Sequence, residues 1–358
     1  MNRYKFTNRR ILKISKKILA VGLILLSQEV IAQKKNKKSI AAAKYKGIVV
    51  SLTKTHLPSI YQRVINENYC GPDCYRSYVG TGDDKKYISW NMESNEKIVY
   101  GNMNTIIHES VHGFNKGPSR HTRGSEFLKF THRVLVSPYK FIDYEGKDVI
   151  KSYKIVDDIL ANNPKIVGLF RFDTYIGENG STSSNVSGIY GLLEEFSAYY
   201  HGCNASFMIY NNLKKENIIQ YYDWDKDDGS TYDTLIMENV WLTVDVAQSC
   251  MSHYSSYYEF NVFIGAYLTY VKKNHPVMYD EILDNQAFRR AYSIIDRNFH
   301  QLAIKMEKEF GYGFKPYRDS GITYKSGVDN LILGKEIISD YTDILDEFRT
   351  TSNLTTKK

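Results

Sequence analysis

The feature that most restricts how this chain can fold is a pair of histidines four residues apart, His108 and His112. If Asn104 or Thr105 opens a helix here, both imidazoles lie on one face and can reach one zinc ion. Glu109 follows the first histidine, where its carboxylate can accept a proton from zinc-bound water without occupying the metal. The run predicts a helix with two zinc ligands and a general base. An ordinary amphipathic helix with surface or core histidines is the alternative.

The first 32 residues have the pattern of a secretory signal peptide. Seven Lys or Arg residues precede a nine-residue apolar core at 18–26. Residues 30–32 have the compact side chains that a signal peptidase recognises, which predicts cleavage after Ala32. That core is too short to cross a bilayer, which needs about twenty residues, and no cysteine near Ala32 offers a lipid anchor. We therefore expect a secreted or periplasmic protein without stable membrane insertion after cleavage.

The formal charge of +7 overstates how basic the folded part is. Seven positive charges belong to the signal segment, and a short leader after Ala32 holds further lysines. The remainder is near neutral, which removes the main reason to expect nucleic-acid binding. The protein is long enough to bury a sizeable core in one large domain or two packed ones.

All four cysteines follow the predicted cleavage site. An exported protein meets an oxidising compartment, and the turn-forming residues between Cys70 and Cys74 favour a local disulfide loop. Cys203 would then pair with Cys250 across two helices. A cysteine zinc site is the rival interpretation, but it needs two ligands besides Cys70 and Cys74.

The segments that lead into the histidine helix are β-prone. We expect strands at Ile48–Leu52, Lys86–Trp90 and Lys97–Tyr100, and a short helix at Leu57–Asn66. After the histidine helix, residues 113–125 are rich in Gly, Pro, Ser and basic residues, which predicts a loop.

Two further histidines follow the motif. His121 lies in the loop after the histidine helix and His132 lies beyond it, and both remain alternative zinc ligands. Helices are predicted at Phe127–Val136 and Lys154–Ala161, and residues 165–175 are β-prone. A polar Gly- and Ser-rich loop at 177–188 is long enough to rim a cleft.

The second informative stretch runs from Gly188 to His201 and predicts a helix. One face is apolar, with Glu195 near its border and Glu194 further round toward solvent. A zinc ion held by two histidines needs a third protein ligand and an open position for water, and a carboxylate on a second helix can supply that ligand. A solvated acidic pair is the alternative interpretation.

At these residues the chain resembles the HExxH zincins, and within them the gluzincins, which take a glutamate as third zinc ligand. The resemblance rests on the run from His108 to His112 and on Glu195 followed three residues later by Ala198. A ligand glutamate with this alanine recurs in aminopeptidases with a Glu-x-x-Ala run and in lethal-factor-like toxins. The match favours Glu195 over Glu194 as the third ligand.

The resemblance covers two short helices and departs from compact relatives in spacing. Glu195 lies 83 positions after His112 (195 − 112), farther than in thermolysin, so residues 125–187 are expected to form an insertion. The metzincin pattern fails, because Asn115 and Pro118 stand where that pattern has Gly and His.

The resemblance implies an α+β, predominantly α-helical fold. It implies a zincin-like catalytic domain, with a small mixed sheet on the histidine helix and a helical lower half. In zincins the edge strand of that sheet binds substrate backbone, and Tyr87–Trp90 or Lys97–Tyr100 is the candidate here. We expect a basic flexible leader at 33–44, the catalytic domain at 45–348 (sheet and active-site helices at 45–202, helical half at 203–348) and a disordered tail at 349–358.

The chain from residue 204 onward is mostly helical by apolar periodicity. The predicted helices are Ser206–Lys215, Tyr232–Val271 with a break near residues 252–256, Pro276–Asp284, Gln286–Phe310 and Val328–Phe348. Residues 223–228 are acidic and similar to a calcium loop, but Gly229 comes one residue late and Thr234 replaces the closing glutamate. A solvated acidic turn is the preferred interpretation there, with bound calcium as the alternative.

The leading functional hypothesis is a secreted zinc metallopeptidase that cleaves a protein or peptide substrate. His108, His112 and Glu195 would bind one Zn²⁺, and Glu109 would act as general base and proton shuttle. Tyr190, Tyr199 and His201 lie near Glu195 in sequence, and Tyr190 or His201 is preferred as the catalytic donor to the oxyanion. The alternatives are a non-catalytic exported binding protein and a zinc hydrolase of a non-peptide amide or ester.

Overall fold

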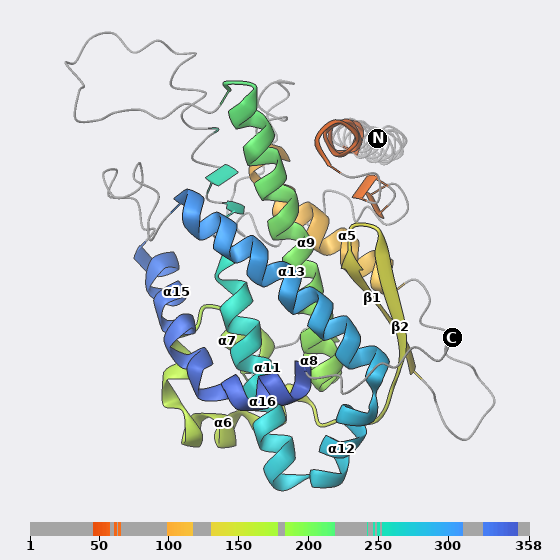
Figure 1. The fold of residues 1–358 in the computed structure, drawn as a ribbon, viewed down its shortest axis with the longest axis vertical. Coiled ribbons are helices and arrows are strands. Elements are labelled where there is room, and N and C mark those ends of the chain that lie inside the picture. The colour runs from red at the N-terminus through yellow and green to blue at the C-terminus, as the bar shows by residue number, and fades with distance from the viewer. Residues whose placement is uncertain are drawn as a thin grey trace, which may run out of the picture. The chain divides into compact units, whose positions relative to one another are not determined.

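The fold is predominantly α-helical, with a two-stranded antiparallel sheet among the described residues, which confirms the predicted α+β class (Figure 1). The computed structural model describes residues 46–57, 61–62, 64–65, 99–116, 130–177, 183–218, 242, 246–247, 249–250, 253–310 and 325–349. The chain divides into two compact units, Met1–Ile48 and Val49–Lys358, and the elements labelled below all belong to the second.

Helix α9 (Gly188–Lys215) is the central element, and it packs against α5, α11, α13 and strand β1 (Figure 1). Most of its residues are buried, which explains why apolar and aromatic side chains occur around its circumference. The helix begins at Gly188, whose φ of 51° lies in the left-handed region that glycine adopts without strain. A Cβ here would also lie 2.3 Å from the Ile150 carbonyl oxygen, so the position requires glycine.

Helix α5 (Met103–Lys116) crosses α9 at close range. Its apolar residues Ile107 and Val111 are fully buried, so the predicted amphipathic helix is confirmed. The close approach depends on Gly202 of α9, where a Cβ would lie 2.5 Å from the Asn104 carbonyl oxygen. A glycine at the crossing therefore lets the two helix backbones approach closely enough for their side chains to meet.

Strands β1 (Phe130–Ser137) and β2 (Lys140–Gly146) form a hairpin beside α5. Val134 pairs with Ile142 in the antiparallel register, and Arg133 binds Asp143 through two hydrogen bonds of 2.8 and 3.0 Å. Strand β1 also contacts α9 and α13, and its Val134, Leu135 and Val136 are buried. This two-stranded antiparallel hairpin is not the sheet that was expected, because its strands follow the histidine helix in sequence, whereas the expected strands precede it.

Two sequence predictions near these elements are wrong. The helix expected at Phe127–Val136 is largely strand β1, because pairing with β2 satisfies its backbone. The β-prone residues 165–175 instead form the 3₁₀ helix η3 (Pro164–Gly168) and the short helix α7 (Phe172–Tyr175), and Asn163 caps η3 by accepting from the Lys165 amide at 3.3 Å.

The strand expected at Ile48–Leu52 is also wrong, since residues 46–56 are helical. Val49, Leu52 and Thr53 are buried there at helical spacing. Val99 and Tyr100 are helical too, which contradicts a strand in that half of Lys97–Tyr100. The other expected edge strand, Cys70, Cys74, His121 and the acidic residues 223–228 lie outside the described residues.

The prediction that the chain after α9 is mostly helical is confirmed where that part is described. Its long helices are α11 (Ser256–Asn274), α12 (Pro276–Asp284), α13 (Gln286–Phe310), α15 (Lys325–Ile338) and α16 (Thr342–Arg349). Shorter helices before α9 are η2 (Ser152–Ile155), α6 (Val156–Asn162) and α8 (Ser183–Val186), and η5 (Ser339–Tyr341) joins α15 to α16. Among the described residues, every helix is too short or too polar to span a bilayer.

The bounds of α12 and α13 agree with the sequence prediction because polar residues separate the two helices. Pro276 occupies the first turn of α12, where its missing amide proton is not needed. Asn285 lies between the helices, and its side chain accepts a hydrogen bond from the Phe288 amide at 3.1 Å.

The predicted disulfide between Cys203 and Cys250 is not formed, and both are buried free thiols. The Cys203 Sγ lies 4.0 Å from the Cys250 carbonyl oxygen and 3.3 Å from the Met306 Sδ. It therefore faces the backbone of Cys250 and a neighbouring thioether. Burial raises the pKa of both thiols, which keeps them protonated and unreactive.

Candidate metal centre

Two histidines of α5 and one glutamate of α9 bring their ligand atoms together in the interior. The His108 Nε2 and His112 Nε2 atoms are 3.0 Å apart. The Glu195 Oε2 atom lies 3.2 Å from His112 Nε2 and 3.5 Å from His108 Nε2. The exposed fractions of these side chains are 5% for His108, 12% for His112 and 8% for Glu195. This buried group could hold a metal ion.

One unsatisfied atom of this group fits a cation. Among the described residues the buried Glu195 Oε2 has no hydrogen-bond partner, and it lies within 3.5 Å of His108 Nε2 and His112 Nε2. Unsatisfied buried polar atoms are costly, so an unpartnered carboxylate oxygen facing two imidazole nitrogens indicates a ligand. Imidazole and carboxylate donors suit zinc and related divalent transition metals rather than calcium, which prefers oxygen ligands alone.

The charges within the group favour an ionised Glu195 and a protonated His112. Burial alone would raise the pKa of Glu195, but His112 and His108 beside it lower that pKa below its usual value. Burial alone would lower the pKa of His112, but Glu195 and Glu194 raise that pKa well above its usual value. A divalent ion would replace the stabilising positive charge and displace the proton from His112.

The structure separates the roles of the two adjacent glutamates. Glu195 contributes its oxygen to the His-His-Glu group. Glu194 instead accepts a hydrogen bond from His112 Nδ1 at 3.1 Å, on the other side of the imidazole ring. From the sequence alone, Glu194 is only an alternative ligand or a solvated residue. The hydrogen bond between Glu194 and the His112 ring could not be predicted from helical periodicity, because the two residues lie on different helices.

Glu109 follows His108 on α5 and is half-buried. In the part of the chain that the structure describes, no hydrogen bond or ion pair engages its carboxylate. The group is therefore adjacent to the metal ligands in sequence and is not committed to another described side chain.

The polar atoms of Tyr190 and His201 are hydrogen-bonded to residues outside the His-His-Glu group. The Tyr190 hydroxyl accepts a hydrogen bond from the Lys147 amide at 3.3 Å. His201 is fully buried, and its ring nitrogens lie 2.9 Å from the Tyr61 hydroxyl and 3.0 Å from the Leu135 carbonyl oxygen. Burial lowers the pKa of His201 to about 3.

His132, an alternative ligand from the sequence, lies in an aromatic stack. Its ring stacks on Tyr144 at 5.3 Å and on Tyr190 at 5.2 Å, with Phe288 closing the cluster at 4.9 Å from Tyr190. Burial lowers the pKa of His132. The structure therefore assigns this histidine to packing between the hairpin and α9.

Sequence reasoning missed His253 and gave Tyr199 no preference. The Tyr199 ring lies 4.4 Å from the His108 ring and 4.9 Å from the His253 ring, and His253 is 6.0 Å from His108. Asn104 donates a hydrogen bond to His253 Nδ1 at 2.8 Å and another to the Ser249 carbonyl oxygen at 3.0 Å. His253 is far from the motif in sequence, so no spacing rule could have found it.

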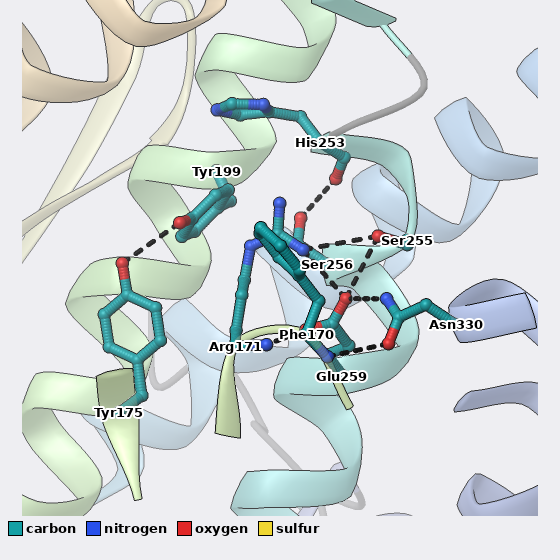
Figure 2. A network of polar contacts seen from close by, with 9 residues as sticks. All are labelled: Phe170, Arg171, Tyr175, Tyr199, His253, Ser255, Ser256, Glu259 and Asn330. Carbon is teal, nitrogen blue, oxygen red and sulfur yellow. Dashed lines mark hydrogen bonds and ion pairs between the residues drawn. The ribbon is translucent and has the colours of Figure 1, made fainter. Parts of the chain in front are cut away.

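A buried polar network lies behind Tyr199 (Figure 2). The Tyr199 ring lies 4.5 Å from the guanidinium carbon of Arg171, and its hydroxyl lies 3.0 Å from that of Tyr175. Arg171 forms an ion pair of 2.8 Å with Glu259 of α11, and the two side chains are 5% and 0% exposed. Asn330 of α15 also donates to Glu259 (Figure 2). The ring beside His108 is thereby held by residues from three helices and one connecting segment.

Comparison with protein families, with curated proteins and with solved structures gives no match.

Proposed function

We propose that this protein is a zinc-dependent metallopeptidase of the gluzincin kind, exported through its N-terminal signal peptide, that hydrolyses protein or peptide substrates. The observation that carries the proposal is the convergence of His108, His112 and Glu195 at one buried point. Three protein ligands leave a coordination position open for water or substrate. This donor set is typical of catalytic zinc, whereas structural zinc sites have four protein ligands, commonly cysteines.

The reaction follows from the chemistry of these groups. His108, His112 and Glu195 would hold the zinc ion, which would supply Lewis-acid activation of a water molecule and of the scissile carbonyl. Glu109 takes the proton from the attacking water and delivers it to the departing amine nitrogen. That role needs a carboxylate beside the ligands but not among them, and Glu109 follows the first candidate ligand on α5. Burial of the ligands excludes bulk water and strengthens each electrostatic contact.

The helix pairing supports the gluzincin assignment over other zinc sites. The histidines come from α5, and the glutamate comes from α9, which crosses it. The hairpin of β1 and β2 lies on the same histidine helix, as the resemblance implies for a sheet beside the cleft. The Tyr199 ring packs against the His108 ring at 4.4 Å and supports the position of that candidate ligand, while the Tyr199 hydroxyl is bonded to Tyr175.

Metal analysis combined with hydrolysis of a mixed peptide library tests the proposal. We expect about one zinc per chain in the purified protein and in Glu109→Gln, and loss of the metal in Glu195→Ala. Glu109→Gln should retain the metal while hydrolysis falls by about 10²-fold or more. Glu281→Gln removes the same charge from an exposed ion pair with Lys147 and serves as the matched control.

Three outcomes would contradict the proposal. A wild-type protein without bound metal at neutral pH would remove its basis. Full peptide hydrolysis by Glu109→Gln would show that the carboxylate is not the general base. Zinc binding with hydrolysis only of non-peptide amides or esters would leave the metal centre in place and replace the substrate class.

A further inference from the structure

We propose that Glu194 is a positioning residue of the metal centre, because its carboxylate holds the His112 ring in the tautomer and orientation that direct the Nε2 lone pair at the ion. This inference rests on the metal site of the proposed function. It assigns a separate task to each glutamate of the Glu194–Glu195 pair.

The geometry places the two carboxylates at opposite nitrogens of one ring. Glu194 Oε1 lies 3.1 Å from His112 Nδ1, and Glu195 Oε2 lies 3.2 Å from His112 Nε2. An ionised carboxylate can only accept, so the proton between Glu194 and the ring belongs to Nδ1. A neutral imidazole protonated at Nδ1 has its lone pair at Nε2. The contact with Glu194 therefore fixes the tautomer that binds metal through Nε2.

Helix geometry explains why adjacent residues can do this. Consecutive residues in an α-helix point about 100° apart around the axis. Glu195 points from α9 toward both histidines, while Glu194 passes beside His112 and reaches its far side. Glu194 and Glu195 therefore contact the two different nitrogens of the His112 ring.

The surroundings of Glu194 strengthen its hydrogen bond. Its side chain is 20% exposed, and the proximity of its charge raises the pKa of the buried Tyr144 hydroxyl further above the level that burial sets. Tyr190, one helical turn before Glu194, packs against Tyr144 at 5.8 Å. Aromatic side chains therefore border the carboxylate, and a charge-assisted hydrogen bond is stronger in such a medium than in water.

His108 provides an internal contrast. In the described part of the chain its buried Nδ1 has no hydrogen-bond partner, and its ring is held by packing against Tyr199. The two histidine ligands are therefore positioned by different means. Loss of the Glu194 carboxylate should disturb His112 alone and leave the orientation of His108 unchanged.

Zinc affinity in a graded series of variants tests the inference. Zinc dissociation constants would be measured at neutral pH by competition with a chromophoric chelator. Glu194→Leu removes the acceptor and the charge, so we expect zinc to bind about 10- to 100-fold more weakly. Glu194→Gln keeps a carbonyl acceptor and should fall between this variant and the wild type. Glu281→Gln, the exposed control, should bind as tightly as the wild type.

A second readout separates positioning from a general structural effect. Histidine labelled with ¹⁵N reports the protonation of each ring nitrogen in the zinc-loaded protein. We expect His112 to be protonated at Nδ1 in the wild type and to lose that single tautomer in Glu194→Leu. Thermal unfolding with a chelator present, compared between both Glu194 variants and the wild type, shows whether the variants keep the fold.

The outcomes distinguish this inference from the proposed function. Equal zinc affinity of Glu194→Leu and the wild type would overturn the inference alone. Weakened binding in Glu194→Leu without peptide hydrolysis by the wild type would overturn the proposed function and support the inference. A wild-type protein that binds no zinc would overturn both.

Discussion

The buried ion pair between Arg171 and Glu259 allows a quantitative test of the network behind the metal centre (Figure 2). Glu259 Oε1 accepts hydrogen bonds from Arg171 Nη1 at 2.8 Å and from Ser255 at 3.0 Å, and Asn330 donates to the same atom. Glu259 Oε2 accepts from the Arg171 backbone amide at 3.0 Å. Removing either charge leaves the other buried without its counter-ion.

The loss of stability in each variant depends on whether a buried charge is left without its partner. Loss of one partner of a buried ion pair costs about 3–5 kcal/mol of unfolding free energy, which we expect for Arg171→Met and for Glu259→Gln separately. The double variant leaves no buried charge, and the Gln carbonyl still accepts from Ser255 and Asn330. In the double variant the backbone amide of residue 171 would lose its good acceptor at position 259, and a buried donor without a partner costs about 1–3 kcal/mol. The two substitutions should therefore be strongly non-additive.

Urea unfolding followed by circular dichroism measures all four free energies of this double-mutant cycle. The exposed pair of Lys147 and Glu281 provides the control cycle, with a coupling of about 1 kcal/mol or less, since its side chains are 59% and 43% exposed. The reasoning is refuted if the double variant loses as much stability as the two single variants together, to within about 0.5 kcal/mol.

Two further predictions concern residues that hold the site in place. His201 has a pKa near 3 in the folded chain and about 6.5 when unfolded, so only the unfolded chain binds its proton in between. The free energy of unfolding should therefore fall by about 1.4 kcal/mol per pH unit as the pH drops from 6.5 toward 3. In His201→Gln the urea midpoint should depend less on pH over that range, and a pH dependence equal to that of the wild type would contradict the prediction. In Gly202→Ala the new Cβ would meet the Asn104 carbonyl oxygen at 2.5 Å, so we expect a loss of about 1–3 kcal/mol and weaker zinc binding. Gly47→Ala, with no atom within 4 Å of its Cβ, should change neither, and equal behaviour of the two variants would rule out a close helix crossing.

Much of the metal centre could be predicted because helical periodicity determines it. Two histidines four residues apart lie on the same face once the helix forms. Glu195 could be selected as the third candidate ligand because it is a carboxylate in an otherwise apolar helix. The helix bounds at Pro276 and Asn285 were predictable for a similar reason, since local capping sets them.

The errors arose where tertiary contacts decide the structure. Val134, Leu135 and Val136 suit a helix or a strand by sequence, and pairing with residues 140–146 selects the strand. Residues 46–56 contain β-branched side chains but bury them at helical spacing. Likewise, the contacts of Glu194 with His112 and of His253 with Asn104 join distant segments, and no local pattern encodes them.

The glycine at the crossing of α5 and α9 links the helix contact to the candidate metal centre. Residues 83 positions apart in sequence (195 − 112) are brought together where the two helix backbones meet at Gly202. His108 and His112 lie on one helix of this crossing and Glu195 lies on the other. A side chain added at Gly202 would therefore separate the two histidines from the glutamate without altering any of the three residues.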